Sequence, residues 1–172
     1  MRLFIALPVP TDLRRALEDV GTSLRRQGVR GRFTPPENLH LTIVFLGNVS
    51  DPAPVIEAMR QEKLPRTALT FDRLTLFGET LVALYRQNDA LEQYARQLRA
   101  KLDAAGISYD RQTFRPHITL CRKTAFPAPG FRLHAFERPL RAARLTVRET
   151  RLTASDLSGE KPKYTDIFRK TD

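Results

Sequence analysis

The amino-acid sequence predicts an α+β fold made of two similar lobes, with helices on the outside. Strand-like apolar runs alternate with segments of helical period along the 172 residues, a length typical of a single domain. The pattern His-x-Thr-x occurs twice, at 40–43 and 117–120, with the two histidines 77 residues apart. A strand-like segment and a helix-capping residue precede each copy. We therefore predict one domain, 1–172, with an approximate internal repeat of 1–77 and 78–172.

The first half begins with an apolar strand at residues 2–7. Thr11 or Asp12 is expected to cap a helix that closes before the glycine at 28. The apolar residues of this segment recur at helical spacing: Leu13, Ala16, Leu17, Val20 and Leu24. Residues 39–47 then form the first motif strand. Asp51 and Pro52 start a short helix, because proline favours the first helical position.

In the second half, residues 67–77 and 81–86 are expected to form a hairpin around the glycine at 78. Asn88, a favoured capping residue, opens a long helix that ends before Gly106. The second motif strand is expected at 117–121 and is followed by a proline-containing loop at 124–140. Two further strands complete the lobe, at 143–154 and 164–168.

The order of these elements indicates an old duplication. Residues 4–7 have a strand-like counterpart 77 residues later at 81–84, and Thr11 has a counterpart in Asn88. A chance match of two short motifs is the alternative, although matching strand, cap and motif offsets favour duplication. Two similar lobes would each contribute one histidine to a shared cleft.

Both histidine motifs lie in apolar strands, where side chains alternate between faces. His40 and Thr42 therefore share one face, and so do His117 and Thr119. Two strands that each offer an imidazole and a hydroxyl supply the groups needed for two-histidine acid–base chemistry on a phosphate. The same alternation places Cys121 on the face of His117.

Composition narrows the class of protein. The 29 Lys and Arg residues exceed the 19 Asp and Glu residues, so the formal net charge is +10, which favours polyanionic partners such as nucleic acid. A solvated, arginine-rich surface is the alternative explanation. No apolar run reaches the ~18 residues of a membrane span. One cysteine fits a reducing compartment, and one cysteine with three histidines disfavours a structural zinc site. We expect a cytoplasmic protein without metal or cofactor.

Two longer segments carry a resemblance to a known family. Residues 32–47 (RFTPPENLHLTIVFLG) and 114–122 (FRPHITLCR) resemble the two signatures of the 2H phosphoesterase superfamily. Within it the sequence is most similar to bacterial and archaeal RNA 2′,3′-cyclic phosphodiesterases, also called 2′-5′ RNA ligases. The opening strand and Tyr164 fit the same family. The resemblance implies a bilobal, pseudo-symmetric fold with two antiparallel sheets facing across a central cleft.

The resemblance also implies an activity and a site. Members of this family open RNA 2′,3′-cyclic phosphates to 2′-phosphomonoesters without a metal, and some join tRNA halves through 2′-5′ linkages. By motif position, His40 and His117 would be catalytic. Thr42, Thr119 and Arg122 would bind the substrate phosphate, although strict alternation puts Arg122 on the face opposite His117. We prefer His40 as the acid and His117 as the base.

Other readings of the sequence remain open. The substrate could instead be a small cyclic nucleotide or a 2′-5′ oligonucleotide, or the chain could be a non-catalytic module that binds RNA ends. A hydrolase with Cys121 as nucleophile is a third class. The family often has Trp where Phe33 stands, so a base-stacking role there is doubtful. We expect RNA or tRNA halves as partners, a monomer, and no membrane or protein partner.

Overall fold

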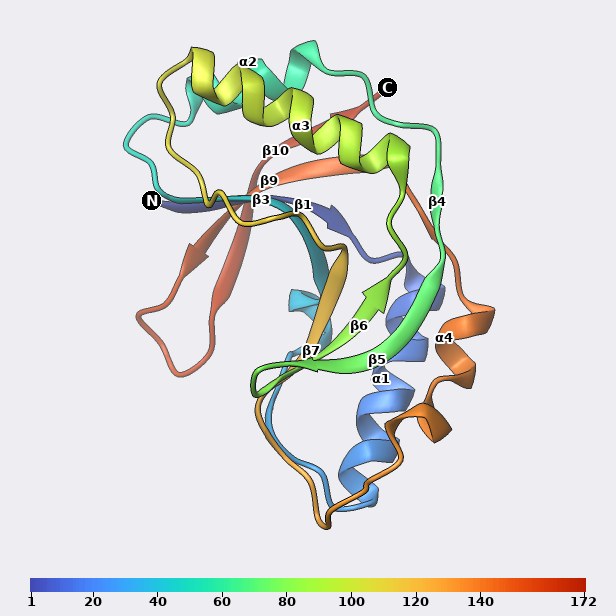
Figure 1. Cartoon of the computed structure of the whole chain (residues 1–172). Coiled ribbons are helices and arrows are strands. Elements are labelled where there is room, and N and C mark those ends of the chain that lie inside the picture. Colours follow the sequence, from blue (N-terminus) through green and yellow to red (C-terminus); the bar gives the residue numbers. More distant parts are fainter.

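The strands of the chain form one main antiparallel sheet and a small second one. The computed structural model describes residues 1–172 (Figure 1). The strands are β1 (Arg2–Pro8), β2 (Arg30–Phe33), β3 (His40–Asn48), β4 (Ala68–Leu69), β5 (Phe71–Phe77), β6 (Thr80–Tyr85), β7 (His117–Ala125), β8 (Leu145–Thr146), β9 (Glu149–Asp156) and β10 (Lys163–Thr171). The helices are α1 (Thr11–Arg26), α2 (Ala53–Gln61), α3 (Asp89–Ala104) and α4 (Arg138–Ala142), with 3₁₀ turns η1 (Pro36–Asn38) and η2 (Leu133–Phe136).

The main sheet has eight strands and consists of two halves. Its order is β10-β9-β1-β3-β7-β6-β5, and β2 pairs with β7, while β4 and β8 form a separate pair. Strands β3 and β7 are the junction, and they share a single residue pair, Leu41 with Ile118. The α+β class and the antiparallel pairing are confirmed. The two predicted sheets are the four-stranded halves on either side of this junction.

The helices lie outside the sheet and tie the halves together. Helices α2 and α3 pack on each other, with α2 against β10 and α3 against β3 (Figure 1). Helix α1 packs against α4 and η2, and η2 packs against β5. Helix α1 follows β1 in the chain and α3 follows β6. Each long helix therefore covers the half of the sheet opposite to the one its preceding strand belongs to.

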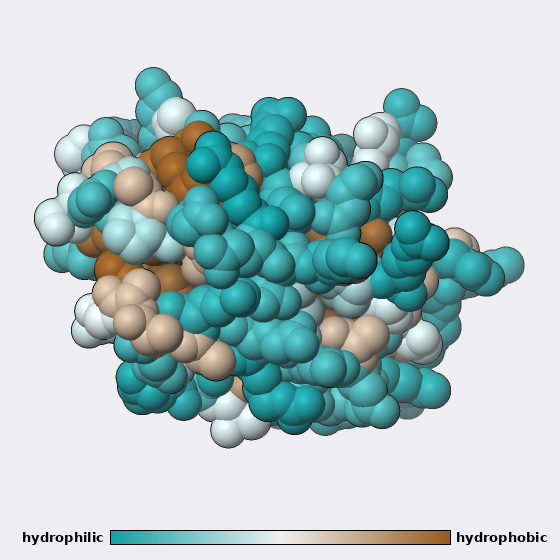
Figure 2. Space-filling view, turned by 90° about the horizontal axis from the view of Figure 1, so that it is seen from above, coloured by the Kyte–Doolittle hydropathy of each residue, from teal (hydrophilic) through white to brown (hydrophobic).

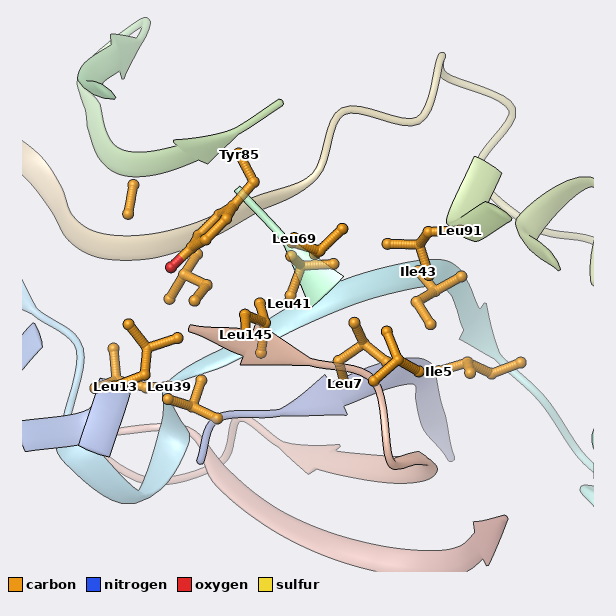
Figure 3. Packing of buried hydrophobic residues seen from close by; sticks show 14 of the residues in the cluster. Ile5, Leu7, Leu13, Leu39, Leu41, Ile43, Leu69, Tyr85, Leu91 and Leu145 are labelled. Atoms are coloured by element: carbon orange, nitrogen blue, oxygen red, sulfur yellow. The ribbon is translucent and has the colours of Figure 1, made fainter. Parts of the chain in front are cut away.

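One hydrophobic core runs beneath both halves of the sheet. It contains 38 buried residues in a single cluster. Figure 3 shows residues of β1 and β3 packed together with Leu91 of α3 and Tyr85 of β6. The outer face seen from above is mostly hydrophilic, with hydrophobic residues gathered on one side (Figure 2). No helix combines the length and the apolar character needed to span a bilayer.

Several predicted elements differ from the structure at their ends. Helix α1 is preceded by Pro10 as its N-cap, without a side-chain capping bond, so neither Thr11 nor Asp12 caps it. Asn88 does cap α3, where its Oδ1 accepts a hydrogen bond from the Leu91 amide at 3.0 Å. The loop predicted at 124–140 is wrong in part, because η2 and the start of α4 lie within it.

The predicted alignment of the first strands is off by one residue. Thr42 of β3 pairs with Ala6 of β1, and Thr119 of β7 pairs with Val82 of β6. Equivalent positions are thus 77 residues apart in the motif strands and 76 apart in their neighbours. A one-residue slip reverses which face a side chain takes, so hydrogen-bond register decides this point. The division into repeats 1–77 and 78–172 stays a prediction.

Gly31 allows β2 to approach the backbone of β7 closely at Arg122 and Lys123. A Cβ atom at Gly31 would lie 2.6 Å from Cys121 Sγ, 2.8 Å from the Arg122 carbonyl oxygen and 2.9 Å from that of Lys123. The φ angle of Gly31 is 149°, and Lys123 has a positive φ of 50°. Two of these three atoms are backbone carbonyl oxygens, which cannot move aside as easily as the end of a flexible side chain. A side chain at position 31 would therefore push β2 away from β7.

We predict that Gly31→Ala lowers the free energy of unfolding by about 2 kcal/mol or more, from overpacking and backbone strain together. Urea unfolding monitored by circular dichroism measures this change. Gly159→Ala is the matched control, because its Cβ would meet only the Lys161 carbonyl oxygen at 3.7 Å. Equal stability of the two variants would contradict the close approach of β2 and β7.

Candidate active site

The junction of β3 and β7 brings the two histidine motifs together. Leu41 and Ile118 are paired and fully buried, so the residues that flank them point to the opposite face of the sheet. In an antiparallel pair, the residue before one partner lies across from the residue after the other. His40 therefore lies on the side of Thr119, and His117 on the side of Thr42. The predicted catalytic and threonine residues meet on one face.

His40 is held by contacts on several sides. Its Nδ1 lies 2.7 Å from the Asn38 carbonyl oxygen, and its Nε2 lies 2.9 Å from Thr42 Oγ1. The ring stacks on Phe4 at a centroid distance of 4.7 Å and meets the edge of Tyr164 at 5.5 Å. These contacts fix the orientation of the imidazole and exclude water from most of its surface.

His117 repeats part of this arrangement. Its Nδ1 lies 2.6 Å from the Arg115 carbonyl oxygen, two residues back, as Asn38 is from His40. The Phe77 ring meets it edge-on at 4.9 Å. The Nε2 atom has no hydrogen bond within the protein. The site is therefore approximately symmetric in its backbone contacts, and it differs at the Nε2 atoms.

The carbonyl contacts determine the tautomer of both imidazoles. A carbonyl oxygen only accepts, so Nδ1 must carry a proton and donate it in each case. In the neutral ring Nε2 then has a free lone pair. At His40 this lone pair accepts the hydroxyl proton of Thr42, whereas at His117 it is open to a ligand. When His40 is protonated, its Nε2–H donates to Thr42 instead.

Burial favours the neutral form of both rings. Desolvation is the main cause that lowers the pKa of His40 below 6.5, opposed by the hydrogen bond to Asn38. The positive charges of Arg122 and His117 lower it further. Desolvation likewise lowers the pKa of His117, opposed by the carbonyl of Arg115, and the charges of Arg115 and Arg122 add to the decrease. A bound phosphate would offset these positive charges.

Arg122 lies near both histidines, contrary to the simple alternation of β7. Thr119 pairs with Val82 and Cys121 with Leu81, so Leu120 is an extra residue between the two pairs. This β-bulge turns both Leu120 and Cys121 into the core, at 4% and 0% exposure. Arg122 is exposed and acts electrostatically on His40 and His117. Its side chain has no acidic partner, so its charge is available to a phosphate.

The bulge also places Cys121 away from the site. Alternation predicts this thiol on the face of His117, and this is wrong because the extra residue shifts the face. The residue is fully buried, and desolvation raises the pKa of its thiol. A nucleophilic cysteine needs an accessible thiolate. The environment of Cys121 thus opposes a role in covalent catalysis.

Two aromatic residues were not singled out as site residues by sequence patterns. Phe4 and Phe77 pack on His40 and His117 respectively. Their rings belong to strands other than the motif strands, so no local spacing reveals the contacts.

Phe33 lies beneath the guanidinium of Arg25 at 4.1 Å from its ring centroid. His134, the third histidine of the chain, is exposed in η2. No group of three or more potential ligand side chains is placed to hold a metal ion.

The fold and this histidine pair define a phosphoesterase-like architecture. The model of the family described as LigT like phosphoesterase matches the chain twice, over residues 7–85 and 82–164. The chain belongs to this LigT-like phosphoesterase family.

Two curated relatives and one solved structure are consistent with this family assignment. The RNA 2′,3′-cyclic phosphodiesterase of Escherichia coli is 27% identical, over 98% of this chain and 94% of that protein. The protein of the same name from Geobacillus stearothermophilus is 31% identical, over 73% of this chain but only 43% of its own length. The crystal structure of E. coli LigT complexed with 3′-AMP superimposes with a TM-score of 0.76 and 27% identity, covering 99% of this chain and 96% of that one.

The shared effect of Arg122 gives a direct test of the site geometry. Removing its charge in Arg122→Gln should raise the pKa of both His40 and His117, because the guanidinium disfavours both imidazolium ions. NMR titration of the histidine Hε1 protons measures the two pKa values. Arg26→Gln, on the outer helix α1, is the control and should leave both in place. Unchanged histidine pKa values in Arg122→Gln would contradict this placement of Arg122.

Proposed function

We propose that the chain hydrolyses RNA 2′,3′-cyclic phosphate ends to 2′-phosphomonoesters by metal-independent, two-histidine acid–base catalysis. The observation that carries the proposal is the pair of imidazoles on joined strands, each with Nδ1 bound to a backbone carbonyl and Nε2 directed to the shared face. The names of the relatives in E. coli and G. stearothermophilus support the same substrate class.

In the proposed reaction, His117 acts as the base. Its Nε2 lone pair has no protein partner and takes a proton from the attacking water. The water oxygen forms a bond to phosphorus while the bond from phosphorus to the ribose 3′-oxygen breaks. The 2′-oxygen keeps the phosphate, and the product is a 2′-phosphomonoester with a free 3′-hydroxyl.

His40 acts as the acid in the same step. Its protonated Nε2 donates a hydrogen bond to Thr42 Oγ1 at 2.9 Å in the free protein, and it transfers this proton to the leaving 3′-oxygen during the reaction. The positive charge of Arg122 and the hydroxyl groups of Thr42 and Thr119 stabilise the non-bridging oxygens as their charge grows. Each proton transfer contributes about 10²–10⁴-fold to the rate.

The same proton transfers would permit RNA ligation. A 5′-hydroxyl in the place of the attacking water would lose its proton to His117, and the 3′-oxygen would again leave with the proton of His40. The new bond would be a 2′-5′ phosphodiester. Exclusion of water from the site by RNA would favour this outcome over hydrolysis. The net charge of +10 supports binding of RNA in either direction.

We predict that His40→Ala and His117→Ala each lower kcat/KM on a short RNA with a 2′,3′-cyclic phosphate end by at least about 10²-fold. The reaction is run in EDTA, and the phosphorylated end is mapped by mass spectrometry with phosphatase treatment. His134→Ala and Cys121→Ala are controls that should retain activity, although Cys121→Ala loses some core packing.

Two results would contradict the proposal. A product that carries only a 3′-phosphate would exclude the proposed leaving group. Activity that disappears in EDTA and returns with a divalent cation would exclude the metal-independent mechanism. Loss of activity in Cys121→Ala with His40→Ala still active would indicate instead a cysteine nucleophile.

A further inference from the structure

Arg115 presents an unpaired positive charge at the edge of the site. The residue is exposed, and it forms no ion pair with an Asp or Glu side chain. Other exposed arginines do form such pairs, for example Arg73 with Asp72 at 2.6 Å and Arg111 with Asp103 at 2.7 Å. The charge of Arg115 is therefore available to an anion from solution.

The guanidinium of Arg115 is also held in position. Its Cζ lies 4.2 Å from the centroid of the Phe77 ring, and the same ring meets His117 at 4.9 Å. The backbone is fixed as well, because the Arg115 carbonyl accepts the hydrogen bond from His117 Nδ1 at 2.6 Å. Stacking on an aromatic ring reduces the conformational freedom of the side chain and leaves its N–H groups free to bind.

The position of Arg115 relative to Arg122 separates two anion contacts. Both guanidinium groups lower the pKa of His117, whereas Arg122 and not Arg115 lowers that of His40. Arg122 lies on β7 five residues after His117, whereas Arg115 lies against the Phe77 ring, which itself meets His117. A second anion linked to the reacting phosphate would meet Arg115 there.

We propose that Arg115 binds the phosphodiester on the 5′ side of the terminal nucleotide, so that the enzyme prefers an RNA chain to a mononucleotide 2′,3′-cyclic phosphate. This inference rests on the proposed function and specifies its substrate. Arginine suits this contact because its planar fork of donors can bind two phosphate oxygens at once. Phe77 serves as the platform that aims the fork.

The test compares two substrates that differ by this phosphodiester and the nucleoside attached to it, so the effect of the Arg115 substitution on their ratio, and not the ratio alone, reports the contact. They are cytidine 2′,3′-cyclic phosphate and cytidylyl-(3′→5′)-cytidine 2′,3′-cyclic phosphate. Arg115→Gln should reduce the ratio of kcat/KM for the dinucleotide over the mononucleotide by about 10-fold, a typical effect of one charge-assisted hydrogen bond. Any change at His117 affects both substrates, so the ratio isolates the second contact. Arg115→Lys should keep only part of the ratio, because an ammonium group retains the charge but not the stacked, two-point contact, and Arg26→Gln should keep all of it.

Binding provides a second readout that does not depend on catalysis. Calorimetry gives Kd for a single-stranded RNA oligonucleotide with a terminal 2′-phosphate across a range of salt concentrations. For single strands each phosphate contact contributes about 0.7 to the slope of log Kd against log salt concentration, so Arg115→Gln should reduce the slope by about that amount. An unchanged slope and ratio in Arg115→Gln, or an equal loss in Arg26→Gln, would overturn the inference. If the wild-type protein cleaves neither compound, the proposed function fails, and the slopes still decide the role of Arg115.

Discussion

The pairing of Leu41 with Ile118 is the constraint on which the site depends. This single pair joins two half-sheets that otherwise diverge, and both of its side chains are buried in the common core. The histidine of each motif precedes this pair by one residue. A one-residue shift in the register of β3 against β7 would move an imidazole to the other face of the sheet. The placement of the two imidazoles on one face is thus set by core packing, and the orientation of each ring by its own contacts.

The surroundings of the two imidazoles explain why aromatic residues flank them. Phe4 and Phe77 remove water from His40 and His117, and burial then favours the neutral rings. Arg122 adds to this effect in the free protein, while the same charge favours binding of an anionic phosphate. Substrate binding would therefore raise the pKa of the histidine that must deliver a proton. In the proposed mechanism, the protonation state of the site would therefore depend on whether phosphate is bound.

Sequence patterns predicted the faces of His40, Thr42, His117 and Thr119 correctly, because strand alternation holds over three residues. Alternation failed beyond Thr119, where the bulge at Leu120 reverses the faces of Cys121 and Arg122. Two consecutive apolar residues in each motif strand, Ile43 and Val44 as well as Leu120 and Cys121, were a signal of this bulge. The family resemblance predicted Arg122 on the same side as the histidines, whereas alternation predicted it on the opposite face.

The contacts of Phe4, Phe77 and Arg115 could not be predicted from local sequence. They arise between strands whose pairing is set by long-range register, as the one-residue difference between the offsets of 77 and 76 shows. The predicted cap of α1 was wrong for a different reason. The residue at the N-cap position is Pro10, whose side chain has no hydrogen-bonding group, so α1 begins without a side-chain cap.

The pH dependence of kcat/KM for the cyclic-phosphate substrate tests the central claim most directly. One histidine must be protonated and the other neutral, and both have a pKa below 6.5 in the free protein. The account predicts a bell-shaped profile with its optimum below pH 6.5, because kcat/KM reports the free enzyme. Activity falls at higher pH as the acid loses its proton, and at lower pH as the base gains one. A profile that is flat or rises steadily from pH 5 to 9 would contradict a two-histidine acid–base mechanism.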